Sequence, residues 1–323
     1  EDLAAVSMFN PGQQFAFDKI MEKVNTNTPA AFFIDGPGGT GKSFLYKALL
    51  ATIRSKGDIA LATATSGAAA SILPGGRTAH SRFKIPLHHE ANSTCNLSKQ
   101  SAVSQLIKTA KLIIWDEAAM AKKFAIESFD RLLRDLLNCD QIFGGKINFG
   151  GDFRQTLPVV RKGQKEDYIS ASLINSYVWP QLEKIHLTKN MRASLDPSFS
   201  DFLLNIGNGT QPVIVDNKVK LPSHMIIPFI DDQPSLDTLI NAVYPSLSSF
   251  LPGNSTVINR VILSTTNDIV HEVNQMLTQK FPGEEVKYIS FDQTIDPSKQ
   301  ADHGDFLNTI HPPGLPPHEL ILK

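Results

Sequence analysis

Residues 36–43 constrain the fold of this chain more than any other segment. The eight positions are Gly36, Pro37, Gly38, Gly39, Thr40, Gly41, Lys42 and Ser43. They match the phosphate-binding loop pattern, with an apolar run before them and a helical pattern after them. In this pattern glycines let backbone N–H groups surround a phosphate, the lysine reaches the β and γ oxygens, and the serine ligates Mg²⁺. An ordinary glycine-rich turn would need neither flank, so the segment predicts a nucleotide site between a strand and a helix.

Short apolar runs rich in β-branched and aromatic residues recur along the chain and predict buried strands. They cover residues 30–35, 59–65, 111–115, 147–150, 185–188 and 261–265. Helical patterns separate most of them, most clearly at 124–138, where Phe129 and several leucines follow helical spacing. Strands that are apolar on both faces and alternate with helices predict an α/β fold, a parallel sheet flanked by helices.

The length of 323 residues suggests about two domains. We expect a complete first domain at 1–194, with an irregular insertion at about 84–104, and a linker with an incomplete second domain at 195–323. Helical patterns in the second part cover residues 199–206, 236–243 and 268–279. The chain opens on Glu1 and not on methionine, which predicts a fragment or a processed form.

The overall charge excludes bulk attraction to a polyanion. Lys plus Arg is 31 and Asp plus Glu is 32, which gives a formal net charge of 31 − 32 = −1. A nucleic acid would therefore have to be held by a local groove. No apolar run approaches the roughly 18 residues that a membrane span needs, so we expect no membrane partner.

Two carboxylates, Asp116 and Glu117, end the apolar run at 111–115. An acidic pair after a strand is by itself most often a solvated loop. With a phosphate loop upstream, we expect this strand beside the loop's strand, Asp116 in the Mg²⁺ shell and Glu117 polarising the attacking water. A further strand runs into a turn with two glycines that ends at Gln155, a candidate sensor of the γ-phosphate.

Seven blocks occur in the order found in one family. They cover residues 9–13, 36–43, 63–69, 75–83, 116–117, 151–155 and 187–192. In this order the chain resembles the superfamily-one DNA helicases, most closely the Pif-type 5′-to-3′ branch and its Helitron-associated form. The resemblance implies a RecA-like fold and an ATP-driven motor on single-stranded DNA, with ATP and Mg²⁺ as cofactors. It also implies that the protein continues beyond Lys323.

The resemblance assigns further roles residue by residue. Gln13 would bind the adenine edge, and Arg192 would be an arginine finger that reaches the γ-phosphate. The single-stranded DNA track would be lined by Thr65, Ser66, His80, Ser81 and Phe83. The insertion would take the place of a strand-separating wedge. A chain with a net charge of −1 has no excess positive charge with which to attract DNA. Hydroxyl groups that hold phosphates and an aromatic ring that stacks on a base could bind the strand instead. The alternative for Phe83 is a buried core ring, and for Ser81 a helix cap.

Roles in DNA repair, recombination, telomere maintenance or Helitron transposition are implied for the protein as a whole. We expect a monomer in the nucleus, with a mitochondrial location as the alternative. Two other functions fit parts of the sequence: a phosphate-loop kinase or nucleotide switch, and a non-catalytic DNA-binding fragment. A zinc site at His88, His89 and Cys95 is disfavoured because these residues lack the paired spacing of structural zinc ligands.

Overall fold

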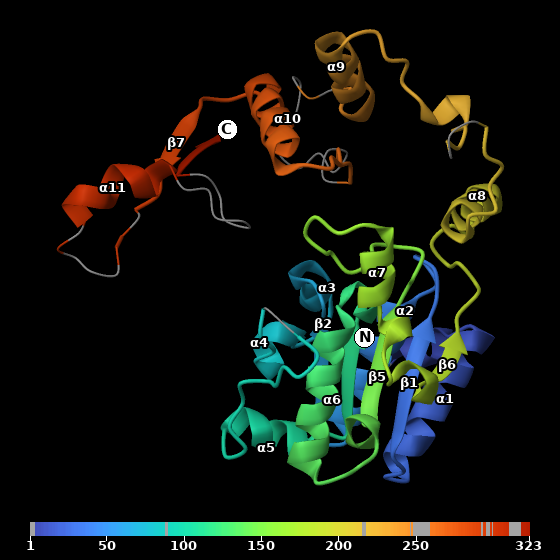
Figure 1. Cartoon of the computed structure of the whole chain (residues 1–323). Helices are drawn as coiled ribbons and strands as arrows, with labels where there is room; N and C mark the ends of the chain where they lie inside the picture. Colours follow the sequence, from blue (N-terminus) through green and yellow to red (C-terminus); the bar gives the residue numbers. More distant parts are fainter. Residues whose placement is uncertain are drawn as a thin grey trace. The chain divides into compact units, whose positions relative to one another are not determined.

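The computed structural model describes residues 4–87, 90–214, 218–245, 247, 259–291, 293–294, 298, 300–309 and 318–323. The chain divides into two compact units, Glu1–Val219 and Lys220–Lys323 (Figure 1). The boundary between the two units lies after helix α8 (Pro197–Asn208), so α8 belongs to the first unit. The domain boundary at 194 and the incomplete second RecA-like domain stay predictions.

The first unit is built on a six-stranded parallel sheet in the order β3-β2-β4-β5-β1-β6. The strands are β1 (Ala30–Asp35), β2 (Ala60–Ala64), β3 (Arg77–Thr78), β4 (Leu112–Asp116), β5 (Lys146–Gly151) and β6 (Glu183–His186). Five of the predicted strands are confirmed within about two residues. The expectation that β4 lies beside β1 is wrong, because β5 pairs with both and separates them.

Helices cover both faces of this sheet. The remaining helices of the unit are α1 (Pro11–Asn25), α2 (Lys42–Ser55), α3 (Gly67–Ile72), α4 (Ala79–Phe83), α5 (Ala102–Thr109), α6 (Lys123–Leu137) and α7 (Lys165–Ala171). Apolar residues of α1 and α2 pack on one face with Phe32, Ile34 and Ile114. Residues of α4, α5 and α6 pack on the other face with Phe33 and Trp115. The two cores confirm the predicted layered α/β fold.

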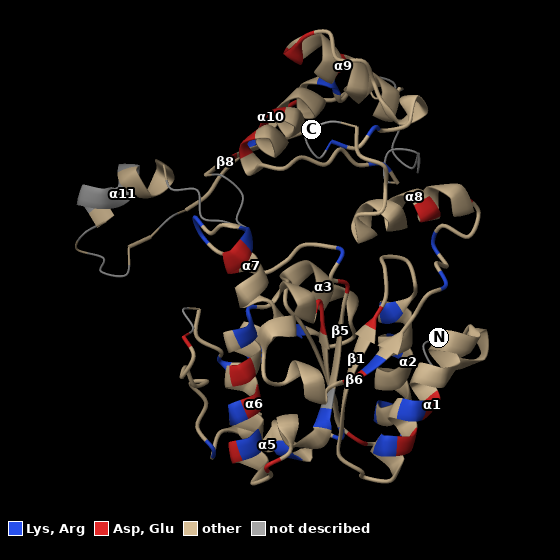
Figure 2. Cartoon of the chain, turned by 45° about the vertical axis from the view of Figure 1, so that its right-hand side comes forward, with Lys and Arg blue, Asp and Glu red and all other residues tan. Residues whose placement is uncertain are grey.

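The amphipathic pattern at 124–138 forms α6, which ends where Asn138 takes a left-handed conformation (φ 49°). Its apolar side packs into the core through Ile126, Phe129 and Leu133. Figure 2 shows Lys and Arg interspersed with Asp and Glu along α1 and α6. A mixed surface of this kind agrees with the near-zero net charge.

The second unit contains helices and a small antiparallel sheet. Its elements are α9 (Asp232–Val243), α10 (Asn267–Lys280), β7 (Val286–Ile289), α11 (Gln300–Thr309) and β8 (Glu319–Leu322). The helical predictions at 236–243 and 268–279 are confirmed by α9 and α10. The predicted strand at 261–265 is wrong: Leu263 is 84% exposed, and within the described residues no strand pairs with this segment to complete a ladder. Among the described residues, no helix has the length and hydropathy to cross a membrane.

Candidate functional site

The predicted motifs gather at one edge of the sheet. Residues 36–41 follow β1, residues 65–66 follow β2 and residues 187–192 follow β6. Residues 116–117 start at the last residue of β4, and residues 151–155 start at the last residue of β5. Because all six strands are parallel, their carboxyl ends lie at the same edge. This is the edge at which open α/β sheets bind ligands. The fold therefore brings together segments that are far apart in the sequence.

The phosphate loop is a tight turn between β1 and α2. Gly39 (φ 93°) and Gly41 (φ 83°) lie in the left-handed region that favours glycine. The Thr40 hydroxyl donates to the Pro37 carbonyl at 2.9 Å, and the Lys42 ammonium donates to the Gly36 carbonyl at 2.5 Å. The first N–H groups of α2 have no intrahelical acceptor and lie beside this turn. The loop thus presents donors to an anion, as the motif predicts.

Gln13 and Asn190 brace the loop from two sides. The Gln13 Nε2 donates to the Thr40 carbonyl at 3.1 Å, while its Oε1 accepts the Asn10 N–H in a capping box at the start of α1. The Asn190 Nδ2 donates to the Gly38 carbonyl at 3.2 Å. A Cβ on Gly41 would collide with the Gln13 amide, so the glycine permits this close approach. The buried Gln13 amide therefore positions the loop, and its adenine contact stays a prediction.

Asp116 and Glu117 place two carboxyl groups beside Lys42. Burial raises the pKa of Asp116. Two groups oppose this rise: the Glu117 N–H, which donates to the Asp116 Oδ1 at 2.9 Å, and the charge of Lys42. Burial and the neighbouring Asp116 and Asp152 raise the pKa of Glu117, against the opposing charge of Lys42. Within the described residues the buried Glu117 Oε2 has no hydrogen-bond partner. An ammonium and two carboxylates therefore share one partly desolvated site.

Glu117 is held in an uncommon backbone conformation. Its φ of 54° and ψ of 37° lie in the left-handed region, which a residue with a side chain seldom adopts. The Thr65 hydroxyl fixes this geometry by donating to the Glu117 carbonyl at 2.7 Å. Such strain is typical of functional positions, because neighbouring contacts must maintain it.

The donor set fits a magnesium ion with a nucleotide. Ser43 lies in the first turn of α2, and the Asp116 carboxylate ends β4 on the face that α2 covers. Hydroxyl and carboxylate oxygens are the ligands that Mg²⁺ prefers, together with phosphate oxygens and water. The unpartnered Glu117 Oε2 leaves an acceptor available beside them.

A polar network connects β5 with β1 and α8. The Gln155 Nε2 donates to Asp152 at 3.0 Å and lies 3.5 Å from a Cβ placed on Gly38. The Arg154 guanidinium lies 3.4 Å from the same Asp152 carboxylate, and its Nε donates to Asn208 at 2.7 Å. The end of β5 therefore contacts both the phosphate loop and α8. Sequence reasoning singled out only Gln155 from this network.

Arg192 lies beside the phosphate loop within the first unit. Its backbone N–H donates to the Gly39 carbonyl at 3.3 Å, next to a 2.9 Å bond from the Met191 N–H to the same oxygen. The Arg192 side chain is exposed. A guanidinium there can turn toward a bound phosphate without leaving a buried partner behind.

The predicted DNA-binding residues follow β2 and β3 and have unequal access. The Thr65 hydroxyl is engaged, since it donates to Glu117 and accepts the Trp115 indole N–H at 3.0 Å. Ser66 caps α3 by accepting the Ala69 N–H at 3.2 Å. His80 is half-buried, which lowers its pKa, and Ser81 is exposed.

The prediction that Phe83 stacks on a DNA base is wrong for this structure. Its side chain is 0% exposed and stacks on Phe129 with ring centroids 4.1 Å apart. The Trp115 ring packs against the Phe83 ring, with the two ring centroids 6.2 Å apart. Phe83 belongs to the core between α4, α6 and the sheet, which was the alternative interpretation of this residue.

A family model described as PIF1-like helicase matches residues 8–217. The chain belongs to the PIF1-like helicase family. The match covers the phosphate loop, both carboxylates and the segment that ends at Arg192. It therefore includes the whole candidate site.

Curated relatives of this PIF1-like chain are much longer proteins. The ATP-dependent DNA helicase Pif1 of Campylobacter jejuni is 31% identical over 159 residues, which are 46% of this chain and 34% of the relative. The ATP-dependent DNA helicase PIF1 of Danio rerio is 28% identical over 188 residues, which are 56% of this chain and 28% of that protein. The matched parts thus span about a third of these relatives or less.

Solved PIF1-family structures share the fold. The crystal structure of Pif1 helicase from Candida albicans matches with a TM-score of 0.67 at 22% identity, over 98% of this chain and 63% of that one. Pif1 from Bacteroides, crystallised with ADP-AlF3 and single-stranded DNA, matches with a TM-score of 0.57 at 23% identity, over 85% of this chain and 60% of that one. With the parallel sheet, this likeness confirms the predicted RecA-like fold.

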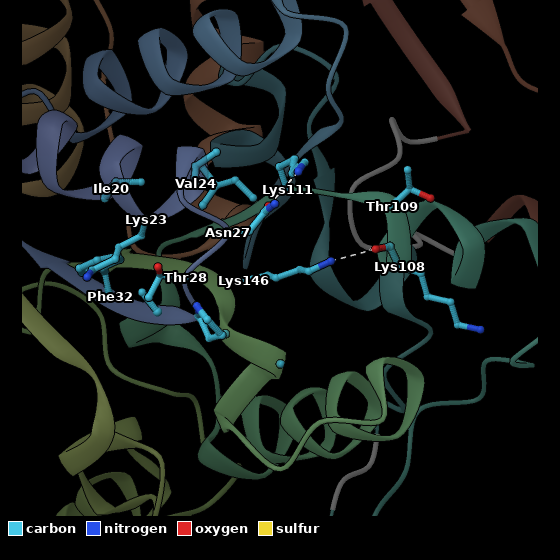
Figure 3. A pocket seen from close by; sticks show the side chains of 15 residues that line it. Ile20, Lys23, Val24, Asn27, Thr28, Phe32, Lys108, Thr109, Lys111 and Lys146 are labelled. Carbon is cyan, nitrogen blue, oxygen red and sulfur yellow. Dashed lines mark hydrogen bonds between the residues drawn. The ribbon is translucent and has the colours of Figure 1, made fainter.

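A separate pocket of about 260 Å³ lies at the opposite, amino-terminal edge of the PIF1-like sheet (Figure 3). Ala30, Leu112 and Lys146 line it where their strands begin. The Lys146 ammonium donates to the Lys108 carbonyl at 2.9 Å, and burial and the charge of Lys111 lower its pKa. Lys146 thereby satisfies a carbonyl near the end of α5. No predicted motif lines this pocket, so it lies outside the candidate site.

The zinc hypothesis rested on three residues, of which His88 and His89 lie outside the described residues. Among the described residues of this PIF1-like chain, no group of at least three histidine, cysteine or acidic side chains is arranged to hold a metal ion. The Cys95 sulfur instead faces the Ser128 carbonyl at 3.6 Å. Burial raises the pKa of the Cys95 thiol to about 12, against the opposing charge of Arg131.

We expect native Cys95 to react with iodoacetamide at pH 8 at least about a hundredfold more slowly than in urea, because only the thiolate is nucleophilic. Mass spectrometry of timed labelling reactions measures both rates, with Cys139 as the internal reference for reagent activity. Equal labelling rates of Cys95 in the native and unfolded chain would contradict the burial of this thiol.

Proposed function

We propose that this chain is the ATP-hydrolysing part of a DNA helicase that moves along single-stranded DNA. The observation that carries the proposal is the convergence of Lys42, Ser43, Asp116 and Glu117 with Gln155 and Arg192 at one edge of the sheet. Membership of the PIF1-like helicase family supports it. So does the Bacteroides Pif1 structure described with ADP-AlF3 and single-stranded DNA.

In the proposed reaction each residue has a distinct task. Ser43 and Asp116 would hold Mg²⁺, which supplies positive charge to the β and γ oxygens when it is bound. Lys42 neutralises the same oxygens. Glu117 would orient the attacking water and accept its proton. Burial raises the pKa of its carboxyl group, and the neighbouring Asp116 raises it further. Arg192 reaches the γ-phosphate and stabilises the charge that develops there.

Binding of single-stranded DNA is proposed for the surface around α3 and α4. Ser66, His80 and Ser81 remain candidate contacts because they lie at or near the surface of this region. Their polar groups can hold phosphates without reading the bases. Several further points remain proposals that rest on family resemblance. They are the 5′-to-3′ direction, the monomeric state, the nuclear or mitochondrial location, the Helitron-type assignment and the cellular pathways.

The proposal is tested by measuring ATP hydrolysis with and without an oligothymidylate. We expect the DNA to raise the rate, since ATP binding and DNA binding are coupled in a translocating motor. Hydrolysis that ignores DNA would favour a nucleotide switch, and phosphate transfer to another acceptor would favour a kinase. DNA binding without any nucleotide binding would favour a non-catalytic fragment.

Replacing Glu117 by glutamine is expected to lower single-turnover ATP hydrolysis by about 10² or more, because an amide cannot accept the proton of the attacking water. Affinity for Mg²⁺-ATP should stay within a few fold of the wild-type value. Rapid-quench kinetics and calorimetry measure the two quantities separately. A collapse of affinity with a normal residual rate would identify Glu117 as a metal ligand and not as the base.

A further inference from the structure

Tyr46 carries a buried hydroxyl that nothing described in the structure satisfies. The residue lies one turn after Lys42 on α2, and its side chain is 0% exposed. Among the described residues, no group forms a hydrogen bond with its Oη. An unpartnered buried hydroxyl is costly, whereas a phenylalanine would fill nearly the same space at no such cost. Packing alone therefore does not account for the hydroxyl.

The sheet makes room for this hydroxyl at Gly150 on β5. A Cβ on Gly150 would overlap the Tyr46 Oη, and the ring atoms next to it would also be too close. Gly150 is not among the glycines with a positive φ, so its backbone conformation is one that other residues also adopt. The glycine is thus required by space, and the space is occupied by the tyrosine hydroxyl.

Strand register places Asp116 next to this position. Ile114 pairs with Asn148 and Trp115 with Phe149, so the next step along both strands brings Asp116 beside Gly150. Side chains alternate between the two faces of a strand. Ile114 faces the α2 side of the sheet, and so does Asp116 two residues later. The hydroxyl and the carboxylate therefore lie on the same face, above neighbouring strands.

The charges around Tyr46 agree with this placement. Burial raises the pKa of Tyr46, and the negative charges of Asp116 and then Glu117 raise it further. The hydroxyl therefore keeps its proton at neutral pH and can act only as a neutral donor toward these carboxylates. Among the described residues, the Glu117 N–H is the backbone donor to the Asp116 carboxylate, on Oδ1.

We propose that Tyr46 is a positioning residue, whose hydroxyl donates a hydrogen bond that holds the Asp116 carboxylate when Mg²⁺ and nucleotide are bound. The inference rests on the proposed function, because it assigns Asp116 to the metal. Groups that orient a metal ligand commonly change metal affinity or activity by 10- to 100-fold when they are removed. The unpartnered hydroxyl in the structure is then a folding cost retained for the site.

The test compares Tyr46→Phe with Tyr177→Phe in the full chain. Tyr177 is the matched control, because its hydroxyl donates to the Asp130 carboxylate at 2.8 Å and is not part of the candidate site. Binding of a fluorescent non-hydrolysable ATP analogue is titrated with Mg²⁺, and urea unfolding is followed in parallel. A binding readout avoids any dependence on the rate of hydrolysis.

For Tyr46→Phe we expect the Mg²⁺ midpoint to rise about tenfold. Affinity for the analogue in EDTA should be unchanged, and the urea midpoint should be equal to or above that of the wild type. Tyr177→Phe is expected to show the reverse, a lower urea midpoint with an unchanged Mg²⁺ midpoint. An unchanged Mg²⁺ midpoint in Tyr46→Phe would overturn the inference and leave the proposed function standing. If the wild-type chain bound the analogue with equal affinity in Mg²⁺ and in EDTA, the assignment of Asp116 to the metal and the inference about Tyr46 would both be overturned.

Discussion

Lys42→Ala is expected to abolish detectable binding and hydrolysis of Mg²⁺-ATP. The Lys42 ammonium is buried beside Asp116 and Glu117, where burial raises the pKa of both carboxyl groups and the charge of Lys42 opposes that rise. Without it, the two carboxylates would face the phosphates without the buried ammonium that offsets their charge. A charge-assisted contact of this kind is not replaced by water in a partly desolvated site. Calorimetry with ATP and Mg²⁺ measures the loss directly.

Lys47→Ala is the matched control for this variant. Lys47 lies on the same helix, is half-buried and is not in the phosphate loop. The Lys47→Ala variant should bind and hydrolyse ATP as the wild type does. A loss confined to Lys42→Ala then cannot reflect a general effect of removing a lysine from α2. Normal turnover in Lys42→Ala would refute the assignment of the loop as the nucleotide site.

Local sequence patterns predicted the parts of the site that short-range physics determines. The loop at 36–43 requires left-handed glycines and a following helix start, and both are encoded within eight residues. The carboxyl-edge arrangement also follows from the pattern, because alternating buried strands and helices specify a parallel sheet. That is why Lys42, Asp116 and Gln155 are found together although they are distant in the sequence.

Long-range pairing was beyond the reach of these patterns. No local signal indicates that β5 lies between β1 and β4, since strand order depends on which strands pair across the whole sheet. The bracing by Asn190 and the Arg154–Asn208 contact likewise join separate segments. The run at 261–265 has the composition of a strand, but strand formation also needs a neighbour with which to share hydrogen bonds.

Phe83 lies in a motif whose composition suggests a surface position, and yet its ring is fully buried. Its block, 75–83, is rich in small and polar residues, which suggests a surface loop. The helix α4 instead turns the ring inward against Phe129 and Trp115. Helical spacing could have indicated this, because Ala79 lies four residues earlier and is also buried in the same core.

Phe83→Ala is therefore expected to destabilise the first unit by about 3 to 5 kcal/mol, the usual cost of truncating a fully buried phenylalanine. The truncation would leave a cavity between α4 and α6, because the Phe83 ring is fully buried there. Both tryptophans of the chain, Trp115 and Trp179, lie in the first unit, so their fluorescence during urea unfolding reports on this unit alone.

Phe15→Ala and Phe83→Leu make the result specific. Phe15 is 57% exposed on α1, so its truncation should change the free energy of unfolding by less than about 1 kcal/mol. Phe83→Leu keeps most of the buried volume and should retain the fold. If the ring stacked on DNA, this leucine variant would be stable but would bind an oligothymidylate about 1 to 3 kcal/mol more weakly. We expect its DNA affinity to equal that of the wild type, because a ring enclosed by Phe129 and Trp115 cannot reach a base without unfolding α4 from the core.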